Sequence, residues 1–210
     1  MNKKFLLISK ILFAFAIVLM IACNQSTKET KDNKSMVQLI TLDPGHFHAA
    51  LVQKSMYAGV DSLVHVYAPK GNDLQLHIDR INGFNSRKDD PTHWKEDIYT
   101  GDDFFETMLK EKKGNVVVLA GNNRKKTEYI LRSLEAGFNV LADKPMTITP
   151  EGFETLKKAF ETAKQNNLLL YDIMTERFEI TTILQRELAM MPEIFGELEK
   201  GTAKDQTAVL

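Results

Sequence analysis

The sequence predicts an α/β protein built on a doubly wound parallel sheet. Short apolar runs rich in β-branched residues alternate with longer stretches of helical periodicity along most of the chain. The run at residues 116–119 is continuous and β-branched, which is typical of a strand buried on both faces. Strands that alternate with helices at this interval favour a parallel sheet with right-handed crossovers.

The first elements follow from apolar runs and helical spacing. We expect strands at residues 37–42 and 63–67, and helices at residues 46–57 and 73–81. The last of these helices presents one apolar face at helical spacing, made by Leu74, His77, Ile78 and Ile81. Residues 82–97 show neither helical nor strand periodicity of their apolar residues, so they are predicted to form a loop of unusual length.

The later elements have start and stop signals. A helix is expected after Asp102 and before Gly114, and a second one closes at Gly137. Thr149, Pro150 and Glu151 supply an N-cap, a first-turn proline and an acid favoured by the helix dipole. That helix is expected to bury Phe153, Leu156, Phe160 and Ala163. A strand at residues 168–171 and a helix at 180–191 complete the prediction.

Composition is consistent with a soluble enzyme and gives no electrostatic argument for binding nucleic acid. Lysine and arginine number 27 against 28 acids, and the net charge is −1. Nucleic-acid binding needs a basic patch or stripe, so no nucleic-acid partner is expected. A hydrophobic content of 43% is normal for a protein with a packed core.

The amino terminus has the pattern of a secretory signal. Lys3 and Lys4 precede an apolar segment at residues 5–21, and a small residue stands before Cys23, the single cysteine. We interpret residues 1–22 as a lipoprotein signal peptide, with Cys23 as the lipidation site that anchors an exported protein to a bacterial membrane. An uncleaved signal anchor with an incidental cysteine is the alternative. Residues 23–35 are polar and are predicted to be a flexible tether.

A lysine is expected at the ligand-binding edge of the sheet. An apolar strand ends in Asp143, Lys144 and Pro145, just before a helix start. In open parallel α/β sheets ligands bind outside the carboxyl ends of the strands, which gives Lys144 a functional interpretation. A solvated turn lysine is the alternative for this motif alone.

The order of these segments resembles the Gfo/Idh/MocA family of nicotinamide-dependent sugar oxidoreductases. The similarity covers residues 116–123, 137–145 and 176–178, with Asp143 in place of the usual Glu of a Glu-Lys-Pro motif. The resemblance implies a Rossmann-like NAD(P)-binding domain at residues 36–178. It also implies that Lys144 hydrogen-bonds the reacting hydroxyl, that Asp143 orients or neutralises it, and that Pro145, Asn122 and Asn123 lie near the cofactor. The family's nearby histidine falls at Lys126.

The turn after the first strand is an unusual dinucleotide loop. Dinucleotide folds carry Gly-x-Gly-x-x-Gly there, so that the backbone can approach the pyrophosphate. This chain keeps only the central glycine in its segment Asp43-Pro44-Gly45-His46-Phe47-His48. We expect Asp43, Gly45, His46 and Phe47 to line the cofactor, with one histidine lining the pocket and the other packing. His-x-His brings both rings to one face only in a strand, and a helix is expected here, so no metal is predicted.

The end of the second strand bears on the choice of cofactor. Enzymes that prefer NAD usually place an acid there on the ribose, whereas this chain offers Lys70 and no acid in residues 67–71. A lysine would attract the additional phosphate of NADP, so NAD or NADP is expected with a weak preference for NADP. A surface loop lysine explains Lys70 equally well.

The substrate side is represented by three candidates. His93 and Trp94 lie in the predicted long loop, where Trp94 suits a sugar-stacking wall, and Arg177 belongs to the family's Asn-x-Arg-Phe element. The competing view is a surface excursion with Trp94 pinned to the core. Residues 179–210 hold a helix and a polar tail, where the family continues into a substrate domain, so the chain is expected to be truncated and Phe178 or Phe195 to be exposed.

The function predicted from the sequence is hydride transfer on a sugar or sugar-like polyol by an exported oxidoreductase. Free nicotinamide is scarce outside the cytoplasm, which favours a tightly bound, recycled cofactor. An NAD-dependent glycosidase of the same family and a non-catalytic binding lipoprotein on a degenerate fold are the alternatives. A carbohydrate ligand, a membrane reached through Cys23, and homo-oligomers formed through the missing domain are the expected partners.

Overall fold

The computed structural model describes residues 36–173, 176–197 and 201. The chain divides into two units, residues 1–35 and 36–210, and the first unit lies outside the described residues. The predicted signal peptide, Cys23 and the tether therefore stay predictions. No helix in the described ranges is long and apolar enough to cross a membrane.

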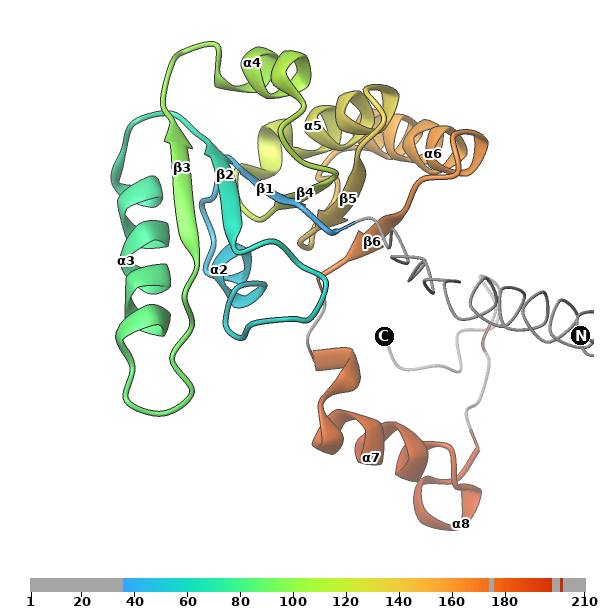
Figure 1. Cartoon of the computed structure of the whole chain (residues 1–210). Coiled ribbons are helices and arrows are strands. Elements are labelled where there is room, and N and C mark those ends of the chain that lie inside the picture. Colours follow the sequence, from blue (N-terminus) through green and yellow to red (C-terminus); the bar gives the residue numbers. More distant parts are fainter. Residues whose placement is uncertain (1–35, 174–175, 198–200, 202–210) are drawn as a thin grey trace, which may run out of the picture. The chain divides into compact units, whose positions relative to one another are not determined.

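A six-stranded, all-parallel sheet forms the centre of the second unit (Figure 1). The strands are β1 (Leu39–Leu42), β2 (Leu63–Tyr67), β3 (Lys95–Tyr99), β4 (Val116–Leu119), β5 (Asn139–Ala142) and β6 (Leu170–Asp172). Their spatial order is β3-β2-β1-β4-β5-β6. This order is that of a doubly wound sheet, whose direction of winding reverses between β1 and β4, so the predicted fold class is confirmed.

Helices cover both faces of this sheet (Figure 1). They are α2 (His48–Leu51), α3 (Asn72–Ser86), α4 (Phe104–Glu111), α5 (Asn123–Glu135) and α6 (Pro150–Gln165). One core cluster joins Ile40, Val117 and Val140 of the sheet to α4, α5 and α6. A second joins Val64 and Val118 to α2 and α3. Two separate apolar faces explain why the strands read as continuous hydrophobic runs.

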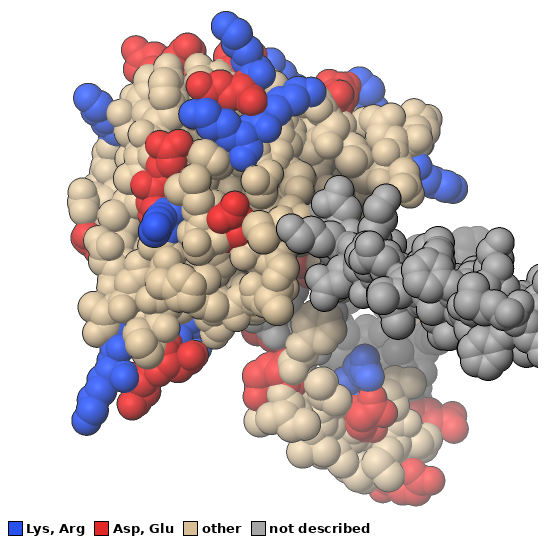
Figure 2. Space-filling view, viewed as in Figure 1, with Lys and Arg blue, Asp and Glu red and all other residues tan. Residues whose placement is uncertain are grey.

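The chain continues beyond β6 into short helices. These are a 3-10 turn at Glu176–Phe178, α7 (Ile180–Ala189) and α8 (Pro192–Phe195). Phe178 and Phe195 are each 67% exposed, which agrees with the expectation of exposed aromatics in this segment. On the face shown in Figure 2, positive and negative side chains are interspersed rather than gathered by sign.

Three local predictions are wrong. The helix expected at residues 46–57 is a single turn, α2; it begins only at His48, because the amides of Gly45 and His46 donate to Ala120 O, directly after β4. The long loop expected at residues 82–97 is short, since α3 extends to Ser86 and β3 begins at Lys95. Phe153 and Phe160 are about half exposed, because α6 packs through Ala159 and Ala163, whose small side chains allow close approach.

Candidate functional site

The strand register brings three loops to one level at the carboxyl edge of the sheet. Leu42 of β1 is aligned with Leu119 of β4, and Leu119 is aligned with Ala142 of β5. The residues that follow these strands therefore start side by side at the point where the winding reverses. Ligands bind at this position in open α/β sheets.

The turn after β5 places Lys144 at this edge. The Lys144–Pro145 peptide is cis, and the Asp143 amide donates to Leu119 O over 2.7 Å. Asp143 is buried, whereas Lys144 and Pro145 are exposed. Among the described residues, the Lys144 ammonium has neither a hydrogen bond nor an ion pair with a protein group. It is therefore available to a ligand.

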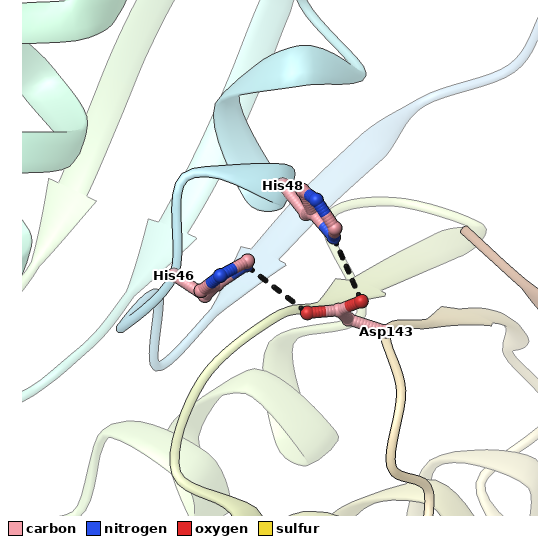
Figure 3. Close-up of side chains that lie close together, drawn as sticks. All are labelled: His46, His48 and Asp143. Carbon is pink, nitrogen blue, oxygen red and sulfur yellow. Dashed lines mark hydrogen bonds and ion pairs between the residues drawn. The ribbon is translucent and has the colours of Figure 1, made fainter. Parts of the chain in front are cut away.

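The Asp143 carboxylate is directed at two histidines (Figure 3). Its Oδ1 lies 2.8 Å from His48 Nδ1, and its Oδ2 lies 3.2 Å from His46 Nδ1. The backbone amide of Lys144 also donates to Oδ1 over 2.8 Å. The expectation that Asp143 neutralises the Lys144 ammonium is therefore not met, since its oxygens are engaged by imidazoles and by a backbone amide.

The two histidines lie in different environments. The His48 side chain is 4% exposed and that of His46 is 37% exposed. One ring therefore packs, as expected from sequence, and the other is partly exposed. Their centroids are 4.3 Å apart, and the Phe47 ring contacts both. Burial lowers the pKa of His46, and His48 and two nearby lysines lower it further, whereas Asp143 opposes them. The argument that His46 and His48 would not share a face is wrong, because α2 begins only at His48 and both rings reach Asp143.

A buried lysine, Lys126, lies beneath this cluster. It is 1% exposed, and its Nζ donates to Asn123 Oδ1 over 2.7 Å and to Asp143 O over 3.2 Å. Burial lowers the pKa of its ammonium, while the Asp143 charge raises it. Sequence reasoning did not select Lys126 as a site residue. A signal was present, since Lys126 occupies the same helical stripe as Ile130 and Leu134.

Gly45 meets a second glycine that sequence reasoning overlooked. A Cβ on Gly45 would lie 3.2 Å from Gly121 Cα, and a Cβ on Gly121 would lie 2.2 Å from Gly45 N. Gly121 has a φ of +144°. Two backbone segments therefore cross at a distance that side chains do not permit. The sequence did contain a signal, because Gly121 follows a buried strand, and glycine is common where two backbone segments approach closely.

The Asp43 carboxylate turns toward protein donors. Its Oδ2 accepts a hydrogen bond from Asn122 Nδ2 over 2.8 Å and from the Tyr129 hydroxyl over 3.3 Å. Asn122 is the N-cap of α5, and both Asp43 and Asn122 have positive φ. The Asp43 carboxylate is therefore oriented toward neutral hydrogen-bond donors within the fold.

A cavity of about 190 Å³ opens beside this crossing, at the ends of β1 and β2. Its lining includes Asp43, Lys70, Gly71 and Asp73. Gly71 is the N-cap of α3, and the helix has no side-chain cap there. The cavity thus joins a cationic side chain to an uncapped helix start. This is a suitable place for the ribose and phosphate half of a dinucleotide, so these residues fit such a group.

Two substrate-side candidates lie elsewhere. His93 and Trp94 immediately precede β3, so in a parallel sheet they lie at the amino edge, opposite Lys144. Trp94 is 4% exposed and belongs to the core cluster under α3, so the sugar-stacking role is wrong and the core role is confirmed. Arg177 lies in the 3-10 turn, and its side chain is outside the described part of the structure.

Comparisons with known proteins agree with this geometry. Residues 45–171 match GFO_IDH_MocA, an oxidoreductase family with an NAD-binding Rossmann fold. One solved structure, from Parabacteroides merdae ATCC 43184, is described as an oxidoreductase. Its sequence is 60% identical to this chain and the TM-score is 0.75; the match covers 80% of this chain and 38% of that protein. An NAD-binding protein from Listeria innocua is 22% identical to this chain, with a TM-score of 0.54. This match covers 77% of this chain and 40% of that protein.

The second of these likenesses shows the fold alone. No curated protein sequence matches the chain significantly. The chain spans only about two fifths of the length of either solved structure. The family match covers more than half of the chain and includes the turn at Gly45, the crossing at Gly121 and the Asp-Lys-Pro turn. The chain therefore belongs to the Gfo/Idh/MocA oxidoreductase family, and its parallel sheet is that family's NAD-binding Rossmann fold.

Proposed function

We propose that this chain is the dinucleotide-binding part of an enzyme that oxidises or reduces a hydroxyl-bearing carbon of a sugar or sugar-like polyol. The observation that carries the proposal is the position of Lys144. Its ammonium is exposed and without a protein partner among the described residues, and it stands at the carboxyl edge of β5, beside the crossing of Gly45 and Gly121. Family membership supports the reaction class.

Cofactor contacts are assigned to the loops at the same edge. Gly45, His46 and Phe47 follow β1, Lys70 follows β2, and Asn122 and Asn123 follow β4. When bound, a nicotinamide ring accepts or supplies the hydride. The amides of Gly45 and His46 already donate to Ala120 O over 2.8 and 2.9 Å. We therefore assign most of the phosphate binding to side chains and to the start of α3, rather than to these two amides.

We assign the proton transfer to Lys144. A lysine ammonium can donate a hydrogen bond to the substrate oxygen, and it can give or take the proton that accompanies hydride transfer. Asp143 holds the turn through its contacts with His48 and with the Lys144 amide, so it is a positioning residue. Proton transfer of this kind contributes about 10²–10⁴-fold to a rate.

The choice between NADP and NAD is proposed to depend on the cavity after β2. Lys70 and the uncapped start of α3 favour an additional phosphate, whereas Asp73 in the first turn of α3 could accept hydrogen bonds from ribose hydroxyls. We favour NADP because Lys70 and the start of α3 would attract its additional phosphate, in a cavity that also holds the carboxylates of Asp43 and Asp73. We also propose an exported, lipid-anchored protein, from residues 1–23, with a tightly held cofactor.

The decisive experiment is native mass spectrometry of the purified protein, with ultraviolet analysis of any molecule released on denaturation. Recovery of NAD or NADP, or a mass shift on adding either, supports the proposal. A clean mass that neither dinucleotide shifts contradicts it and favours the non-catalytic binding lipoprotein.

Turnover is tested by following reduced nicotinamide with a panel of monosaccharides and polyols. Lys144→Ala should keep the bound dinucleotide and lose roughly 10²-fold or more of the rate, in line with loss of a general acid or base. Lys125→Ala, which removes an exposed lysine of α5, is the matched control. Normal turnover by the Lys144→Ala variant would show that Lys144 takes no part in the proton transfer.

A further inference from the structure

His46, His48 and Asp143 form a cluster whose geometry the dinucleotide does not explain. Each offers one ligand atom, and these atoms all lie within 4.8 Å of one another. His46 lies in the turn after β1, His48 begins α2 and Asp143 follows β5, and the three side chains point toward one another (Figure 3). His46 Nδ1 is buried and has no hydrogen-bond partner, although it is directed at Asp143 Oδ2.

We propose that this cluster binds a divalent transition metal of the zinc class. Two imidazole nitrogens and one carboxylate oxygen are a donor set typical of zinc, and they are less suited to magnesium or calcium, which prefer oxygen ligands alone. Three protein ligands leave a fourth position open, as in catalytic zinc sites. The open position would lie toward the partly exposed His46.

The three ligand atoms lie within 4.8 Å of one another, so a tetrahedral site needs a contraction of the cluster. With bonds of about 2.0–2.1 Å, neighbouring ligand atoms lie roughly 3.3 Å apart. The spacing of 3.2 Å between His46 Nδ1 and Asp143 Oδ2 already matches this value. For coordination through one carboxylate oxygen, Oδ2 would also serve His48, whose Nδ1 now lies 2.8 Å from Oδ1. The His48 ring would therefore shift toward Oδ2 and would bind without its Nδ1 proton.

The backbone holds both loops in place without a metal. The amides of Gly45 and His46 donate to Ala120 O, and the Asp143 amide donates to Leu119 O. The ligands are thus fixed to the end of the same strand, β4. The Lys144 amide adds a hydrogen bond to the Asp143 carboxylate, which is the kind of outer contact that orients metal ligands.

Two lysines set a limit on the affinity. The Lys126 ammonium lies 3.2 Å from Asp143 O, and Lys144 follows Asp143 directly, so both charges oppose a bound cation. We therefore expect binding in the micromolar range, with a Kd below about 10 μM. The cluster adjoins Lys144, where a metal would polarise the substrate oxygen as a Lewis acid. Metal binding itself does not depend on the proposed hydride transfer, so the two proposals fail separately.

The test is a titration of the whole protein, purified without a polyhistidine tag, with Co²⁺ and Zn²⁺. The expected result is one equivalent of Co²⁺ with a visible spectrum of nitrogen and oxygen coordination, displaced by Zn²⁺. His46→Ala should weaken binding by roughly 100-fold, since loss of outer-sphere contacts alone costs about 10–100-fold. His65→Ala is the matched control, because it removes a separate histidine–aspartate pair whose aspartate, Asp97, is more exposed than Asp143.

Each result decides the question. Absence of stoichiometric binding by the wild type overturns the proposal, and so does binding that His46→Ala leaves unchanged or that His65→Ala abolishes. His46 is partly exposed, so its replacement should fold, which circular dichroism can verify. If His48→Ala fails to fold, the wild-type Co²⁺ spectrum and His46→Ala still give the answer.

Discussion

At Gly121 the backbone leaves no room for a side chain. A Cβ there would lie 2.2 Å from Gly45 N, and the φ of +144° is one that side chains rarely adopt. We expect Gly121→Ala to lower the free energy of unfolding by about 2–4 kcal/mol and to weaken dinucleotide binding. Chemical denaturation and a binding titration measure the two effects.

Gly83→Ala is the control for this substitution. Gly83 lies in α3, and a Cβ there meets nothing within 4 Å. Alanine should therefore leave stability unchanged or raise it by up to about 1 kcal/mol, because glycine is the poorer helix former. Equal stability of the two variants would show that the crossing of Gly45 and Gly121 is looser than described.

Lys70 and Asp73 favour different dinucleotides. If the cavity holds the phosphate of NADP, Lys70→Ala should weaken NADP by roughly 10-fold and leave NAD nearly unchanged, because only NADP carries that charge. Asp73→Ala should weaken NAD more than NADP, since its carboxylate suits ribose hydroxyls. Isothermal titration with both dinucleotides measures each ratio. A Lys70→Ala variant that binds NADP as tightly as the wild type does would make Lys70 an ordinary surface lysine.

At the scale of single elements, Asn85 determines how α3 leads into β3. Its Oδ1 accepts hydrogen bonds from the Trp94 amide over 3.0 Å and from Thr92 Oγ1 over 2.7 Å. Its Nδ2 donates to Trp94 O over 2.9 Å. One side chain thus closes the short loop and seats the buried Trp94. Helical periodicity did not reveal this, because the contacts join residues that the sequence places in a nonperiodic stretch.

We expect Asn85→Ala to lower the free energy of unfolding by roughly 2–3 kcal/mol, because it leaves buried polar groups without partners. Trp94 is the only tryptophan, so its fluorescence reports the change directly in a urea titration. Asn82→Ala, on the exposed side of the same helix, should change stability by less than about 0.5 kcal/mol. Similar losses in both variants would argue against a specific role for Asn85.

At the scale of the whole molecule, the proposed lipid anchor is testable through Cys23. We expect the wild-type protein to fractionate with bacterial membranes and Cys23→Ser to lose the lipid, since only a cysteine can be acylated there. Ser26→Ala, in the same polar segment, is the control and should behave as wild type. If Cys23→Ser stays membrane-bound, an uncleaved signal anchor is favoured; if the wild type is already soluble, the lipoprotein proposal is wrong.

The sequence by itself determined the fold class, five of the six described strands and the position of Lys144 at the carboxyl edge, but it missed β3. These depend on local periodicity and on the general rule that parallel strands end at one edge. The tertiary structure decided the convergence of His46 and His48 on Asp143, the burial of Lys126 and the pairing of Gly45 with Gly121. Those contacts join residues that are 17 to 97 positions apart, so they depend on strand register and packing, which no local pattern encodes.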